Sequence, residues 1–221
     1  MDVTADRLCL GRMQNPVRGF MHGTAALLSL VGAVVLLDRA VGDLGLRIAL
    51  GVFGCSLVGL YTVSSLYHSI PWRSVWKCRM QRADHSMIYV VVAATYTPIA
   101  MAVCDGWLCA AALIATWGIA AVGIAQKVFR PEIGSWFSVG MQTLQGWLAL
   151  PFLGMLARQM PIGAFLLVLA GGLAYTVGMV FFVTRRPQLW PRVFSYHELF
   201  HVCVVMGSAL HYSAILTYVA R

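Results

Sequence analysis

Long apolar runs dominate this chain of 221 residues and constrain its fold more than any other feature. A helix that crosses the hydrocarbon core of a bilayer needs about 20 consecutive, mostly apolar residues. Hydrophobic residues make up 60% of the chain and charged residues only 11%, far from the averages of soluble domains. Seven runs reach this length and predict an all-α membrane protein: Arg18–Leu37, Leu46–His68, Asp84–Val103, Trp107–Gln126, Trp136–Leu156, Pro161–Val183 and His197–Val219.

These runs predict one seven-helix transmembrane domain over residues 18–221, preceded by a polar arm over residues 1–17. Lys and Arg are more frequent in cytoplasmic loops than in external ones. With the N-terminus inside, twelve of the sixteen Lys and Arg residues fall on cytoplasmic segments and four on external ones. We therefore expect a cytoplasmic N-terminus and an external C-terminus, and no cleaved signal peptide.

The composition excludes two further classes of protein. The net charge of +8 does not indicate nucleic-acid binding, because the basic residues are distributed over short loops and form no continuous patch. The six cysteines form no CxxC pair, so neither a zinc ribbon nor a disulfide framework is predicted. Membrane lipids are the expected partners, and the sequence leaves the oligomeric state open.

Five of the six histidines fall at the cytoplasmic ends of the predicted spans. Ionisable groups inside a membrane are costly, and they are usually paired or coordinated. His211 is outside this layer, because it lies ten residues, or about 15 Å, beyond His201 along the same helix. The layer contains His22, His68, His85, His197 and His201, together with the carboxylates of Asp84 and Glu198.

This layer predicts a metal site. His197 and His201 are four residues apart, so both imidazoles lie on one face of a helix and can reach one ion. His68 would be the third ligand, leaving a fourth position for water as in catalytic zinc sites. Asp84 would accept a proton from that water, and Ser64, one turn before His68, would orient the water or donate to an oxyanion. A hydrogen-bonded cap without metal is the alternative.

The same histidine pair also matches a second pattern. His197-Glu198-Leu199-Phe200-His201 fits the HExxH motif of zinc metalloproteases, in which the glutamate is the general base. An intramembrane protease would use Glu198 as base and Asp84 as third ligand. In the rival interpretation Asp84 is the base, and Glu198 is a solvated or Arg-paired charge. Supporting or substrate-facing roles are expected for His22, His85, Gln142 and Gln145, although hydrogen bonds between helices would also explain the two glutamines.

Four short motifs carry a resemblance to a known family. They are Ser64-Ser65-Leu66-Tyr67-His68, Arg82-Ala83-Asp84-His85-Ser86-Met87-Ile88-Tyr89, Ala94-Thr95-Tyr96-Thr97-Pro98 and His197-Glu198-Leu199-Phe200-His201. Together and in this order they resemble the hemolysin III family, the bacterial branch of the progestin and adipoQ receptors and a relative of the adiponectin receptors. The similarity covers nearly the whole chain.

The resemblance implies a seven-helix bundle in the bacterial inner membrane, with Zn²⁺ held by His68, His197 and His201 near the cytoplasmic side. Asp84 and Ser64 would lie beside the ion. The family is grouped with alkaline ceramidases, which suggests a zinc-dependent hydrolase of lipid amide or ester bonds that influences membrane lipid homeostasis. A pore-forming, cytolytic protein and a non-catalytic, zinc-stabilised receptor or sensor are the alternatives.

One position departs from the family pattern. The family's first span begins with an acidic residue and an Asn-x-x-x-His-Gly sequence. Here Arg18 stands at the position of that asparagine, ahead of His22 and Gly23, and no acidic residue lies nearby in the sequence. The departure affects any contribution of the first span to the site and leaves the three expected ligands unchanged.

Overall fold

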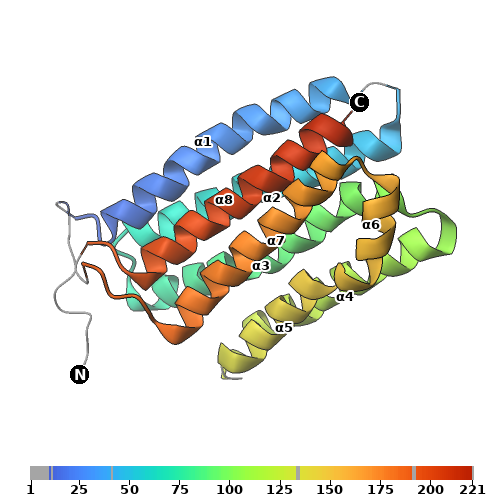
Figure 1. The fold of residues 1–221 in the computed structure, drawn as a ribbon. Coiled ribbons are helices and arrows are strands. Elements are labelled where there is room, and N and C mark those ends of the chain that lie inside the picture. Colours follow the sequence, from blue (N-terminus) through green and yellow to red (C-terminus); the bar gives the residue numbers. More distant parts are fainter. Residues whose placement is uncertain (1–9, 11, 41, 133–134, 191–192, 221) are drawn as a thin grey trace.

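The computed structural model of the chain is helical throughout its folded part, and it describes residues 10, 12–40, 42–132, 135–190 and 193–220 (Figure 1). Among these residues, α1, α2, α3, α4, α7 and α8 are long and apolar enough to cross a membrane, which makes the chain a multi-pass membrane protein. The elements are α1 (Pro16–Arg39), α2 (Leu44–Ser69), α3 (Ser74–Val103), α4 (Gly106–Phe129), α5 (Ser135–Trp147), the 3₁₀ turn η2 (Leu150–Phe152), α6 (Leu153–Gln159), α7 (Ile162–Thr184) and α8 (Tyr196–Tyr218).

The fifth predicted span, Trp136–Leu156, is not one continuous helix. It is divided into α5, η2 and α6, and the interruption falls at Pro151 in η2. Proline has no backbone N–H, and its ring clashes with the carbonyl of the preceding helical turn. The hydropathy of the segment therefore predicted its length but not its shape.

The other spans are close to their predicted positions, with one large difference. Helix α3 begins at Ser74, ten residues before the predicted Asp84, because the polar segment ahead of the apolar run is also helical. Pro98 lies inside α3 and does not end the helix. Most of the predicted arm over residues 1–17 lies outside the described residues, and α1 already begins at Pro16 within it.

The long helices lie side by side along a common direction (Figure 1). Neighbours in the sequence pack together from α1 to α4, α7 packs on α8, and α8 also contacts α1 and α3. At the end of the bundle where α1 begins, α2 and α7 finish and α3 and α8 start (Figure 1). We call this the histidine end, because it brings His68 of α2 close to His197 of α8. The α5–η2–α6 segment returns the chain to the opposite end, where α7 starts (Figure 1).

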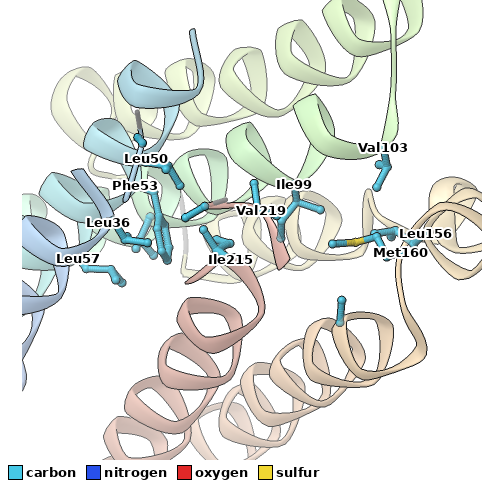
Figure 2. Close-up of a cluster of buried hydrophobic side chains, with 14 of the residues drawn as sticks. Leu36, Leu50, Phe53, Leu57, Ile99, Val103, Leu156, Met160, Ile215 and Val219 are labelled. Atoms are coloured by element: carbon cyan, nitrogen blue, oxygen red, sulfur yellow. The ribbon is translucent and has the colours of Figure 1, made fainter. Parts of the chain in front are cut away.

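Apolar side chains close the end of the bundle opposite to the histidine end (Figure 2). Leu36, Leu50, Phe53, Val103 and Ile215 are buried there, where α1, α2, α3 and α8 meet. Many large apolar side chains on the outer surface are exposed, as expected for helices whose solvent is lipid. These include Leu27, Leu28, Val31 and Val34 on α1, Trp107 and Ile114 on α4, and Leu166 and Val180 on α7.

Close approach of the helices depends on small residues. A Cβ atom added to Gly54 of α2 would lie 2.7 Å from the Cβ of Ala33 on α1. Lipid tails are as apolar as leucine, so helix packing in a membrane gains from such close backbone contacts and from hydrogen bonds between helices.

Candidate metal centre

Three imidazoles from two helices meet at the histidine end. The ring centroids of His197 and His201 are 4.9 Å apart. The ring centroid of His68 lies 5.3 Å from that of His197 and 4.9 Å from that of His201. Each ring offers one nitrogen, and these three nitrogens all lie within 4.8 Å of one another. His68 and His201 are buried, and His197 is partly buried. The structure thus brings together the three residues that were predicted as ligands.

Local structure explains why these rings converge. His197 and His201 occupy the first two turns of α8, one turn apart on one face. A capping box starts this helix: the Ser195 side chain accepts the backbone N–H of Glu198, and the Glu198 carboxylate accepts the N–H of Ser195 at 2.8 Å. His68 is in the last turn of α2, which ends beside the start of α8.

The arrangement fits a divalent metal ion. Ligand nitrogens of a tetrahedral zinc site lie about 3.4 Å apart when each is 2.0–2.1 Å from the ion, so small ring rotations would close this triad on one ion. Nδ1 of His201 is buried and has no hydrogen-bond partner among the described residues, a costly state that a ligand would relieve. Three neutral imidazoles also leave a fourth coordination position open for water or a carbonyl oxygen.

Asp84 and Ser64 lie together, and Ser64 shares α2 with His68. Both are buried, with 8% and 2% of their surface exposed, and the Ser64 hydroxyl interacts with the Asp84 carboxylate. Ser64 is one helical turn before His68 on α2. The structure therefore connects the predicted carboxylate, through the predicted hydroxyl, to the helix that carries His68.

Glu198 makes a buried ion pair. Its Oε1 atom accepts a hydrogen bond from Nε of Arg18 at 2.6 Å, and its Oε2 atom is the acceptor in the capping box. The two side chains are 5% and 8% exposed. The glutamate is thus Arg-paired, as one interpretation of the sequence held, but it is not solvated. Because both carboxylate oxygens are engaged, Glu198 is poorly placed to act as the base of a metalloprotease.

The two other histidines of the predicted layer differ in their position. His22 of α1 stacks on His201 with ring centroids 4.0 Å apart and planes inclined by 25°, and it meets Tyr61 edge-on at 5.0 Å. His85 is partly buried on α3 and lies near Lys127 of α4, outside the triad. His211, which was expected to lie elsewhere, bonds to the Val168 carbonyl at 3.0 Å.

The two glutamines of α5 also have different surroundings. Gln145 is fully buried, and its Nε2 donates to the backbone carbonyls of Tyr89 on α3 and Thr116 on α4, at 3.0 and 3.1 Å. Gln145 therefore forms hydrogen bonds between helices, which was the alternative that the sequence left open. Because it is fully buried, it does not face a lipid headgroup. Gln142 lines the cavity described next.

An apolar cavity reaches Phe200, the neighbour of His201 on α8, and no sequence pattern predicted it; none of the three imidazoles lines it. It has a volume of about 430 Å³ and lies between α3, α5, α7 and α8. Its lining includes Val91, Tyr96, Val168 and Phe200. The Phe200 ring is 5.8 Å from that of His201 between centroids, so one side chain forms part of the cavity wall and also contacts the triad.

Replacing Gln145 by leucine is expected to lower the free energy of unfolding by about 1–2 kcal/mol, because two hydrogen bonds between helices are lost. Reversible unfolding in mixed detergent micelles would measure the change. Gln142→Leu is the matched control, since it alters the same helix on the cavity side. If both substitutions lower the free energy of unfolding equally, the two Gln145 hydrogen bonds add no stability beyond that of a glutamine elsewhere on α5.

Comparisons with known proteins agree with this architecture. A family model described as Haemolysin-III related matches residues 11–212. Hemolysin-3 of Bacillus cereus is 34% identical over 90% of this chain and 88% of its own length. The Hemolysin-3 homolog of Bacillus subtilis is 31% identical over 90% of this chain and 92% of its own. The human monocyte to macrophage differentiation factor is 27% identical over 91% and 83%, respectively. With this extent of similarity, the chain belongs to the haemolysin-III related family.

Proposed function

We propose that this protein is a zinc-dependent hydrolase that cleaves amide or ester bonds of membrane lipids. The observation that carries the proposal is the meeting of His68, His197 and His201 in a buried cluster beside an apolar cavity. The Asp84–Ser64 pair, whose serine is one helical turn from His68 on α2, adds a group able to move protons. Phe200 links the cluster to the cavity, so a lipid chain in the cavity would place its polar end near the histidines.

The three imidazoles would hold the ion. When bound, zinc supplies Lewis-acid chemistry: it polarises a carbonyl and makes water nucleophilic near neutral pH. In the proposed reaction water adds to the lipid carbonyl carbon, and Asp84 accepts the proton that water loses. Asp84 then returns this proton to the leaving nitrogen or oxygen as the C–N or C–O bond breaks. Ser64 keeps the Asp84 carboxylate oriented toward the attacking water.

The proposed membrane setting rests on the apolar helices and on the positions of Lys and Arg. We propose seven crossings, with α5, η2 and α6 together forming the fifth, a cytoplasmic N-terminus and an external C-terminus. The histidine end then lies at the cytoplasmic leaflet of the bacterial inner membrane. Basic residues at this end, such as Arg73, Lys77 and Arg79, support the orientation because Lys and Arg favour the cytoplasmic side. Lipids of this leaflet are the proposed substrates, and their turnover would influence lipid homeostasis.

Purified protein in lipid nanodiscs is expected to release fatty acid from a ceramide-like or phospholipid substrate. Release should stop when a chelator removes the metal, and added Zn²⁺ should restore it, because the Lewis acid is required for attack on the carbonyl. Mass spectrometry of the lipid fraction measures the products. Release that is unchanged by the chelator would contradict a metal-dependent hydrolase.

The name of the Bacillus cereus relative, Hemolysin-3, favours a second candidate, in which the chain permeabilises membranes. Leakage of a dye from proteoliposomes distinguishes the two candidates. Leakage that is unaffected by chelation and accompanied by no lipid cleavage would support permeabilisation over hydrolysis.

A further inference from the structure

Helix α1 supplies none of the three clustered imidazoles, yet it contacts α8 beside two of them. Nε of Arg18 donates to Glu198, next to His197, and the His22 ring stacks on His201. Arg18 and His22 are four residues apart on α1, and Glu198 and His201 are three apart on α8. At these spacings each pair lies on one face of its helix. The two faces therefore meet at two contacts: the Arg18–Glu198 ion pair and the stacking of His22 on His201.

The same turns of α1 also hold the end of α2. The backbone N–H of Asn15 donates to the carbonyl of His68 at 3.0 Å, and Ser65 Oγ donates to the carbonyl of Gly19 at 2.8 Å. A Cβ atom on Gly19 would collide with the Ser69 side chain, so α1 and the end of α2 pack closely at this point. Helix α1 therefore touches both ligand-bearing helices, α2 at His68 and α8 around His197 and His201.

The Arg18–Glu198 pair makes the contact with α8 costly to break. Both side chains are buried, and removal of Arg18 would take the paired cation away from a carboxylate inside the bundle. The carboxylate also accepts the N–H of Ser195, so it connects the first turn of α8 to Arg18 on α1. Among the described residues, the acid that pairs with Arg18 is therefore Glu198 of α8.

We propose that α1 is a positioning helix, which sets the distance between His68 on α2 and the histidine pair on α8 through Arg18 and Glu198. Glu198 then serves the HExxH sequence as an anchor for the helix and not as a base. The expected consequence, tight metal binding, rests on the proposed metal centre. The distance between α2 and α8 can be measured without metal.

Metal binding provides the first test. Arg18→Ala and Glu198→Gln are expected to weaken Zn²⁺ binding about 10- to 100-fold, as is usual when groups that orient metal ligands are removed. They should also change the visible absorption spectrum of the Co²⁺-loaded protein, which reports ligand geometry. Glu132→Gln, which breaks the exposed pair with Arg130, is the matched control and should change neither. Arg18→Lys, which keeps the charge, should restore part of the affinity.

A distance measurement provides the second test. Spin labels at Leu66→Cys on α2 and Val202→Cys on α8 would be placed on exposed positions, with the native cysteines replaced. In metal-free protein, Arg18→Ala and Gly19→Val should broaden or shift the distance between the labels. Gly172→Val should leave it unchanged, because a Cβ at Gly172 meets no atom within 4 Å.

The two measurements separate the possible failures. A wild-type protein that binds no metal, but whose label distance shifts in the Arg18 and Gly19 variants, would refute the metal centre and support the positioning role of α1. Normal metal binding with an unchanged spectrum and an unchanged distance in these variants would overturn the positioning role. A Glu198→Gln variant that keeps metal affinity but loses all lipid cleavage would also overturn it, by making Glu198 the base.

Discussion

Replacing His201 with alanine is expected to reduce bound metal from about one ion per chain to none. A zinc site with an open position has three protein ligands, and two imidazoles alone do not hold the ion through purification. His201 is the most deeply buried of the three, at 2% exposure, so water cannot easily take its place. Elemental analysis of protein that has been exchanged into buffer with trace zinc measures the loss.

His211→Ala is the matched control for this result. It removes a buried imidazole from the same helix, but that ring bonds to the Val168 carbonyl and lies about three turns from His201. We expect it to lower stability and leave the metal content unchanged. Metal retained in His201→Ala, or lost equally in both variants, would contradict the assigned triad.

Hydropathy predicted most of the fold because six of the seven apolar runs form single helices. The exceptions have local causes that hydropathy does not measure. Pro151 interrupts the fifth run, and the polar residues from Ser74 onward extend α3 although they add no apolar surface. Both features depend on backbone geometry and helix propensity.

The triad could be predicted because depth in a membrane follows from the sequence: His68 ends one apolar run and His197 begins another. Rotation of each helix about its own axis does not follow in this way. The pairing of Arg18 with Glu198 and the bonds from Gln145 to α3 and α4 depend on that rotation. The cavity beside Phe200 was missed for the same reason, since several helices must be oriented together before it exists.

Asp84→Asn is expected to leave metal content unchanged and to lower fatty-acid release about 10²- to 10⁴-fold, the usual contribution of a general base. The amide keeps the size of the carboxylate and can still bond to Ser64, but it cannot accept a proton from water. Ser64→Ala should have a smaller effect on release, because it removes the partner of the base and not the base itself. Loss of metal in Asp84→Asn would instead make Asp84 a ligand, as the protease interpretation requires. Full activity would show that another group accepts the proton.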